Sequence, residues 1–202
     1  MKKPINIEEV DGFYYNKDTN QPYSGSYVLY YENGGRKEEG IIKNGRPDGK
    51  WFGWYESGEK EQEVHYKDGE LGKSTQWYKN GKKEWERTGY DGLYTEWYEN
   101  GKKSLEMTYK DGEYDGLYTE WYENGKKSLE GTYKDGGENG LWTKWYENGK
   151  KHLEGTYKDE IFDGLWTGWY ENGQKKKEGT YKDGETISEK CWDEDGNEKE
   201  CD

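Results

Sequence analysis

The two histidines, His65 and His152, are the residues that could most readily act as a general acid or base. A catalytic histidine needs a nucleophile or a carboxylate within hydrogen-bond reach. His65 stands beside Tyr66, and His152 occupies the place that Ser104 and Ser128 hold in similar segments. Neither neighbourhood supplies a recurring catalytic partner. We therefore expect both histidines to be solvated strand residues.

The carboxylates and glycines form no recognisable catalytic, cofactor or metal motif. Glycosidase chemistry needs two carboxyl groups at a defined separation, one of them buried, whereas Glu106 and Asp111 belong to a polar, repeated pattern. Segment 193–197 starts like a calcium loop, but Glu198 takes the sixth position, where an EF-hand needs glycine. The glycine pairs stand at turns and precede no helix, unlike a phosphate loop. We predict no enzyme, no cofactor and no metal site.

Composition restricts both the fold and the partner. Hydrophobic residues make up 28% of the 202 residues, against ~45–50% in an ordinary packed domain, but aromatic residues make up 17%. Each buried aromatic ring can remove ~150–250 Å² from water, which suits a thin sheet lined by rings. The formal net charge of −13 disfavours direct binding to nucleic acid or to an anionic membrane. It favours a basic protein partner, because opposite fields speed encounter.

The chain carries no obvious membrane or export signal. No apolar run approaches the ~18–20 residues of a membrane-spanning helix, and residues 1–7 lack the apolar core of a signal peptide. We expect a cytoplasmic protein, or the processed form of an exported one. Cys191 and Cys201 flank the last turn. A disulfide is possible there, but we favour two reduced thiols, as in a cytosolic protein.

A repeat of 24 residues dominates the chain. The segment GLYTEWYENGKKSLEMTYKDGEYD recurs at this spacing in the second half, and weaker copies precede it, one of 23 residues and one of 20. The seven copies begin at Gly25, Gly49, Gly72, Gly92, Gly116, Gly140 and Gly164.

Each copy has the pattern of a β-hairpin. Segment 93–99 is rich in threonine and aromatic residues, which favour strands. Asn100-Gly101 is a strong hairpin-turn signal, and segment 102–109 is the return strand. We expect an all-β fold, an elongated and twisted antiparallel meander of tandem hairpins that is largely a single layer.

The hairpin register is left open by the sequence. A two-residue loop would pair Tyr98 with Lys103, whereas a three-residue loop with a bulge would pair Trp97 with Lys103. The choice matters because a shift of one residue moves side chains to the other face of the sheet.

The predicted organisation has three parts. Residues 1–24 form a lead-in hairpin with its turn near Asp18-Thr19-Asn20, and residues 25–186 hold the seven hairpin repeats. Residues 187–202 form a capping hairpin with its turn at Asp195-Gly196-Asn197. Caps are expected because the end copies of a repeat array must shield the stack.

The repeated unit, G-x-x-x-x-W-Y-x-N-G-K followed by Y-K-D-G-x-x-x-G, resembles the MORN-type repeat. It is more closely similar to the bacterial variant found in YwqK-family antitoxin proteins, as are segments 14–25 and 191–197. The resemblance covers residues 12–202 and implies a non-catalytic binding protein. The YwqK group implies neutralisation of a partner toxin, and other MORN proteins imply scaffolding or phospholipid contact.

Departures from the repeat are better candidates for a partner-binding site than the shared columns, which maintain the sheet. We select six such residues in three pairs: Trp51 and Phe52, Trp85 and Arg87, and Ile161 and Phe162. The first pair stands where other copies have small or mixed residues, and the second lies in the shortened copy, where we expect an indented sheet edge. The third replaces polar turn tips and would expose apolar groups. Tryptophan and arginine are also enriched at binding hot spots.

The function predicted from these features is inhibition by binding. An antitoxin or immunity-type protein would occlude a basic partner, such as a toxin, a nuclease or a CRISPR effector, with its acidic, aromatic sheet. Anti-CRISPR proteins provide an analogy in charge and size. The alternative is a MORN-type scaffold that self-associates or contacts phospholipid.

Overall fold

The computed structural model describes residues 6–201, which form strands, turns and connecting segments without a helix. The predicted all-β meander of hairpins is confirmed. Most of the segment compared above with a signal peptide, residues 1–5, lies outside the described residues. The chain divides into two compact units, residues 1–90 and residues 91–202.

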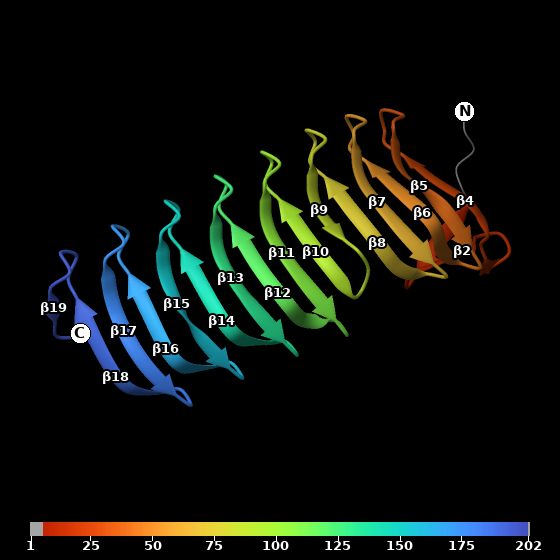
Figure 1. Cartoon of the computed structure of the whole chain (residues 1–202). Coiled ribbons are helices and arrows are strands. Elements are labelled where there is room, and N and C mark those ends of the chain that lie inside the picture. Colours follow the sequence, from red (N-terminus) through yellow and green to blue (C-terminus); the bar gives the residue numbers. More distant parts are fainter. Residues whose placement is uncertain (1–5, 202) are drawn as a thin grey trace. The chain divides into compact units, whose positions relative to one another are not determined.

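Unit 1 contains two sheets. The first three strands pair in the order β1-β2-β3. The other six form an antiparallel meander in chain order (Figure 1). The strands are β1 (Ile7–Val10), β2 (Phe13–Asn16), β3 (Gln21–Pro22), β4 (Gly25–Tyr30), β5 (Arg36–Lys43), β6 (Arg46–Trp54), β7 (Lys60–Lys67), β8 (Glu70–Trp77) and β9 (Lys83–Arg87).

Unit 2 is one antiparallel meander, and each strand pairs with the next strand in the chain (Figure 1). The strands are β10 (Gly92–Trp97), β11 (Lys103–Lys110), β12 (Glu113–Trp121), β13 (Lys127–Lys134), β14 (Gly137–Trp145), β15 (Lys151–Lys158), β16 (Ile161–Trp169), β17 (Lys175–Lys182), β18 (Glu185–Trp192) and β19 (Glu198–Lys199).

The hairpin turn within each copy has the bulged register. Trp97 pairs with Lys103, and the register shifts between Glu96 and Trp97. The Gly101 N–H donates to the Tyr98 carbonyl at 2.7 Å, and the Tyr98 N–H donates to the Lys102 carbonyl. Gly101 has a φ of +88°, so it supplies the left-handed residue that closes a three-residue loop. The same shift recurs in the other hairpins of unit 2.

The turns between copies are two-residue turns with left-handed backbone at both positions. Asp111 and Gly112 have φ values of 53° and 83°, as a type I′ turn requires. The corresponding turn before β16 is Asp159-Glu160, in which Glu160 has a φ of 65°. Ile161 and Phe162 therefore follow the turn as the first residues of β16. This corrects the expectation that they occupy the turn tip.

Alternation along the strands gives each meander two different faces. In unit 2, Tyr94 lies opposite Met107 on one face, which we call the aromatic face. Thr95 lies opposite Glu106 on the other, which we call the lysine–glutamate face. The same columns define both faces in unit 1, where Trp51 pairs with Val64 on the aromatic face.

Large rings on the aromatic face cover glycines of the preceding strand. Trp142 and Trp166 are 5% and 6% exposed. A Cβ added to Gly131 would lie 2.1 Å from Cδ2 of Trp142, and one added to Gly155 would lie 2.0 Å from Cδ2 of Trp166. Each indole therefore fills the space that a side chain would take.

The residue opposite varies with the size of the ring. Tyr118 occupies the same column as Trp142 and Trp166, and it pairs with Met107 instead of a glycine. The smaller phenol ring leaves room for a side chain on the neighbouring strand. The chain thus uses two alternative packings of one site, tryptophan on glycine and tyrosine on methionine.

The W-Y-x-N-G-K motif joins successive hairpins through their backbones. The Tyr122 hydroxyl donates to the Trp145 carbonyl at 2.6 Å, and the Asn124 amide donates to the Glu147 carbonyl at 3.0 Å. Lys126 Nζ donates to the Asn148 carbonyl at 2.7 Å. These side chains satisfy carbonyl groups near the hairpin ends. The motif therefore serves the stacking of the repeats.

Strands β1–β3 cover the aromatic face of unit 1. Ile7, Tyr14 and Tyr23 pack against a buried cluster of Ile42, Trp51 and Val64. The Tyr14 ring centroid lies 6.0 Å from that of Trp51. Backbone hydrogen bonds fix the cover in place, since the Tyr14 N–H donates to the carbonyl of the β5–β6 turn at 2.9 Å. Unit 1 therefore has a second layer.

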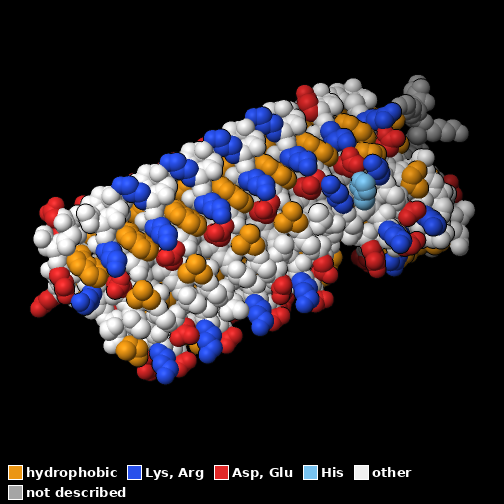
Figure 2. Space-filling model, viewed as in Figure 1, with side chains coloured by type: hydrophobic (Ala, Val, Ile, Leu, Met, Phe, Trp, Pro, Cys, Tyr) orange, Lys and Arg blue, Asp and Glu red, His pale blue; other side chains and the backbone are white. Residues whose placement is uncertain are grey.

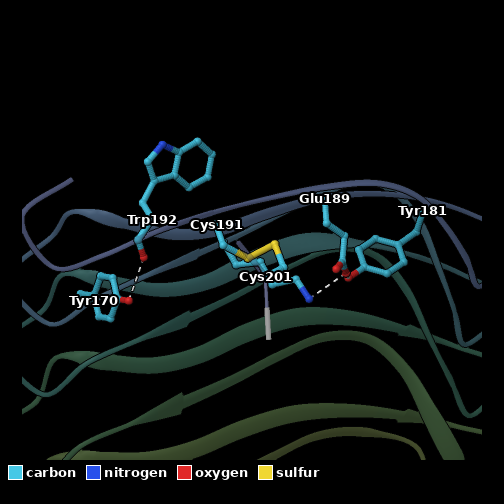
Figure 3. The surroundings of a disulfide bond; sticks show 7 residues. Tyr170, Tyr181, Glu189, Cys191, Trp192 and Cys201 are labelled. Atoms are coloured by element: carbon cyan, nitrogen blue, oxygen red, sulfur yellow. Dashed lines mark hydrogen bonds and ion pairs between the residues drawn. A yellow bond between two sulfur atoms is a disulfide. The ribbon is translucent and has the colours of Figure 1, made fainter. Parts of the chain in front are cut away.

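A disulfide between Cys191 and Cys201 closes the end of unit 2 (Figure 3). Their Cα atoms are 5.3 Å apart, and Cys191 is buried. This corrects the expectation of two reduced thiols: the Asp193–Asn197 turn brings β19 back beside β18, where Cys191 pairs with Lys199. Beside the bridge, the Tyr170 hydroxyl donates to the Trp192 carbonyl.

The pairing of ring and glycine predicts the outcome of a two-site exchange. Gly155→Met should lower the free energy of unfolding by about 2–3 kcal/mol, because the new side chain displaces the Trp166 indole. Gly155→Met combined with Trp166→Tyr copies the Met107–Tyr118 pair and should recover much of the loss. Urea denaturation of both variants and of Trp166→Tyr alone measures the coupling. Additive losses would contradict the two-packing interpretation.

Candidate binding surface

The aromatic face of unit 2 has no second layer. The described strands of unit 2, β10–β19, all belong to the one meander, so none of them forms a layer over it. Within residues 91–201, nothing takes the place that β1–β3 take on unit 1. Tyr114, Leu153 and Phe162 are 37–38% exposed on this face. We call this surface, lined by the rings described next, the open aromatic face.

The rings of the open aromatic face form a continuous run across the strands. Neighbouring centroids lie 4.2–6.1 Å apart. Many of the contacts are edge-on or tilted, the geometries that aromatic pairs prefer. The rings that form the run are Tyr109, Tyr114, Tyr118, Tyr133, Trp142, Tyr157, Trp166, Phe162 and Tyr181.

Two hollows lie beside this run. The first, of about 180 Å³, has a lining that consists of Leu129, Glu138, Trp142, Thr143, Lys144, Leu153, Tyr157 and Trp166. The second, of about 130 Å³, lies between Phe162 and Gly168. Gly168 occupies the column that holds glutamate in earlier copies, so the missing side chain opens the second hollow. Both hollows are mostly apolar and could accept a partner's side chains.

Three carboxylates stand among the rings of the open aromatic face. The Tyr94 hydroxyl donates to Glu96 at 2.5 Å, and the Tyr118 hydroxyl donates to Glu120. Burial raises the pKa of Tyr118, and the bond to Glu120 raises it further. Glu138 similarly adds to the effect of burial in raising the pKa of Tyr157. None of the ion pairs between described residues includes Glu96, Glu120 or Glu138.

On the lysine–glutamate face, by contrast, glutamates form ion pairs with neighbouring lysines. Lys151 pairs with Glu154 at 2.5 Å, and Lys103 lies 5.6 Å from the Trp121 ring centroid. Beneath these side chains, Thr143 is buried and donates to Glu154. Rows of hydrophobic, basic and acidic side chains recur across the strands in Figure 2. Corresponding pairs are Lys60–Glu63, Lys83–Glu86, Lys103–Glu106, Lys127–Glu130 and Lys175–Glu178.

The structure separates Trp51 and Phe52, which were predicted to bind a partner together. Trp51 is 5% exposed and belongs to the core beneath β1–β3. Its column holds an aromatic residue in most copies, so its burial gives it a structural role. Phe52 lies on the lysine–glutamate face, with its ring centroid 6.0 Å from that of Trp54.

The other four predicted residues also do not converge. Trp85 and Arg87 lie on β9 of unit 1, opposite Gln76 and Ser74. Arg87 Nη2 donates to the Tyr90 carbonyl at 2.6 Å. Ile161 points away from the open aromatic face.

Phe162 is the one predicted residue on the open aromatic face. Its neighbours there were missed because their columns recur in several copies and were assigned to the sheet alone. The sequence signal for the surface is the aromatic lead-in segment 13–15, whose Tyr14 packs on the aromatic face of unit 1.

Both histidines are partly exposed, and each lies against another side chain. His65 does have a carboxylate within reach, since its Nε2 lies 3.0 Å from Glu63 Oε1. Lys60 is the main cause that lowers the pKa of Glu63 to about 2, followed by His65. His152 stacks on Tyr146 with centroids 4.4 Å apart. Burial, then Lys144, lowers the pKa of His152.

Comparison with known protein families identifies the repeat. The MORN repeat variant family matches five segments of 22 residues each, more than half of the chain. The chain belongs to the MORN repeat variant family. The matched segments are residues 47–68, 90–111, 114–135, 138–159 and 162–183.

The MORN repeats define a repeat scaffold, while the copies that begin at Gly25 and Gly72 fall largely outside the matched segments. No curated protein sequence matches the chain. Among residues 6–201, no group of three or more histidine, cysteine or acidic side chains is placed to hold a metal ion. The described residues also include no helix of the length and apolarity that crossing a membrane requires.

The cover on unit 1 predicts a pH-dependent stability effect at Glu38. Burial raises the pKa of Glu38 above its ordinary value of 4.5, Lys37 opposes the shift, and Glu9 on β1 adds to it. A raised pKa means that the folded state disfavours the carboxylate, so stability falls as pH rises from the ordinary value through the folded value. Glu38→Gln should therefore raise the melting temperature at neutral pH, and this gain should shrink as pH falls towards 4.5.

Thermal melts at several pH values measure the effect of Glu38→Gln. Glu39→Gln is the matched control, because Glu39 points to the other face and pairs with Arg36 at 2.6 Å. The control should show no gain at neutral pH. Equal gains in both variants would show that reduced net charge, and not burial under β1–β3, is the cause.

Proposed function

We propose that this MORN repeat protein is a non-catalytic inhibitor that binds a basic protein through the open aromatic face. The observation that carries the proposal is the difference between the units. Strands β1–β3 pack over part of the aromatic face of unit 1, whereas no described strand of unit 2 lies over its own aromatic face. Large uncovered apolar patches mark binding surfaces in soluble proteins.

The charge of the chain supports a basic partner. The net charge is −13, and an acidic protein attracts a basic one over a distance of about a Debye length. The resemblance to YwqK-family antitoxins supports an inhibitor of the antitoxin or immunity type. Its targets would be a toxin, a nuclease or a CRISPR effector, blocked by occlusion of a functional surface.

The inhibitor proposal predicts that the side chain of Phe162 contributes to the affinity for the partner. Phe162→Ala should weaken partner binding by about tenfold, because a central aromatic contact contributes roughly 1–2 kcal/mol. Leu165→Ala is the matched control, since Leu165 is 54% exposed on the lysine–glutamate face. Calorimetry with the partner purified from the native host measures both affinities.

The same experiment also measures the activity of the partner and the dependence of affinity on ionic strength. The partner's activity should fall as the complex forms, and affinity should decrease as ionic strength rises. Failure to recover any partner that the protein inhibits would overturn the proposal. Equal weakening by Phe162→Ala and Leu165→Ala would show that the open aromatic face is not the binding surface.

Self-association is a second candidate function, because β18 presents a free strand edge. β19 pairs only with Cys191 and Trp192 among the described residues, and residues 185–190 are all exposed. Ile187 is 62% exposed. An uncovered edge is a template for pairing with another chain. Light scattering that shows a concentration-dependent dimer, lost in Ile187→Lys, would support this function, and a strict monomer would exclude it.

A further inference from the structure

The cover on unit 1 shows which kind of segment the aromatic face accepts. Tyr14 of β2 lays its ring against Tyr27 and Trp51, at 5.3 and 6.0 Å between centroids. The segment is extended, and it is held by a few backbone hydrogen bonds at its edge. An aromatic face of this fold is thus covered by extended chain that supplies side chains to the rings.

The open aromatic face differs from the covered one in polarity. In unit 1, the corresponding positions hold Ile42, which is 1% exposed beneath β1–β3, and Gly53. In unit 2 these columns hold Tyr133 and Glu120. Tyr66 shares the column of Ile42 and Tyr133 and packs against the covered cluster, so the phenol rings are common to both units. The difference lies in the other column, where Gly53 corresponds to the carboxylate of Glu120. An occupant of the open aromatic face that carries positive charge would complement this carboxylate.

The carboxylates lie where a cation would also meet aromatic rings. Glu120 accepts from Tyr118, whose ring centroid is 5.4 Å from that of Tyr133. Glu96 stands in the same column one repeat earlier and accepts from Tyr94. An arginine guanidinium combines well with such a site, because it stacks on aromatic faces and donates to carboxylates. The chain itself stacks an arginine in this way, with Arg46 at 4.5 Å from the Phe13 ring centroid.

The spacing of the repeats limits the conformation of the occupant. Successive copies lie two strands apart, which is about 9.6 Å in a β-sheet. A polyproline II helix rises ~3.1 Å per residue with three residues per turn. Every third residue therefore points in the same direction about 9.3 Å further on. A segment that crosses the strands in this conformation can present one side chain to each successive copy.

We propose that the open aromatic face binds an extended, polyproline II-like segment of the partner with two arginines three residues apart. The arginines pair with Glu96 and Glu120, and at the next two intervals of three residues apolar side chains enter the hollows at Trp142 and Phe162. Lys144 takes the glutamate column beside Trp142, so a third cation is disfavoured there. This inference rests on the proposed function and adds the chemistry of the recognised segment.

Synthetic peptides test the spacing. One peptide carries two arginines three residues apart, followed by two aromatic residues at the same interval, and a second of identical composition spaces these residues by two. Calorimetry should show binding of the first peptide and at least tenfold weaker binding of the second. Equal affinities would overturn the proposed conformation.

Charge variants of the full chain test the contacts. Glu96→Gln combined with Glu120→Gln should lower the affinity for the first peptide by about tenfold or more. The matched control is Glu123→Gln with Glu147→Gln, which changes the net charge equally at exposed hairpin tips and should leave affinity unchanged. Equal losses in both double variants would reduce the interaction to non-specific attraction and overturn the inference.

Two further measurements distinguish the possible outcomes: a Tyr118→Phe variant and a comparison with the native partner. Tyr118→Phe retains the ring and releases Glu120 from its hydrogen bond, so it should bind the first peptide at least as tightly even if the double variant folds poorly. A tenfold loss in Tyr118→Phe would overturn the pairing of arginine with Glu120. If the native partner binds with sensitivity to Phe162→Ala while neither peptide binds, the proposed function stands and this inference fails.

Discussion

The shielding of backbone and glycine by large flat side chains is the interaction on which this structure depends. A meander with no second layer has no deep core, so each strand must bury what it can under side chains of its neighbours. Trp166 over Gly155 and the paired Lys151 and Glu154 over Thr143 do this on opposite faces. The low hydrophobic content and high aromatic content follow from this constraint, because rings bury more area per residue than aliphatic side chains.

The same constraint makes the repeats depend on one another. Hydrogen bonds such as that from the Tyr122 hydroxyl to the Trp145 carbonyl cross from one copy to the next. A terminal copy lacks one of its neighbours, and the two units meet this problem differently. Unit 1 adds β1–β3 as a cover, whereas unit 2 shortens its last strand and ties Cys201 to Cys191. Nearest-neighbour stabilisation of this kind is general in repeat proteins.

Local signals made the hairpins, turns and columns predictable from the sequence. Asn100-Gly101 marked a turn correctly, but the register depended on whether one or both residues adopt a left-handed backbone, and only Gly101 does so. The disulfide required knowing that the last turn brings Cys201 back beside β18. The binding surface was less predictable, because Trp51 and Trp166 share a column and differ only in whether another segment covers the surrounding face.

This difference between copies explains how a uniform scaffold can carry a specific surface. Columns that contact neighbouring strands, such as that of Tyr122, are constrained in every copy, so the fold determines their residue types. Columns that face outward are constrained only by what covers them. Gly53 in one such column presents no polar side chain, whereas Glu120 in the same column keeps a carboxylate that a permanent apolar cover would leave unsatisfied. Under the proposed function, the carboxylates of Glu96 and Glu120 among the rings, more than departure from the consensus, therefore distinguish the partner surface from the face that the protein covers with its own chain.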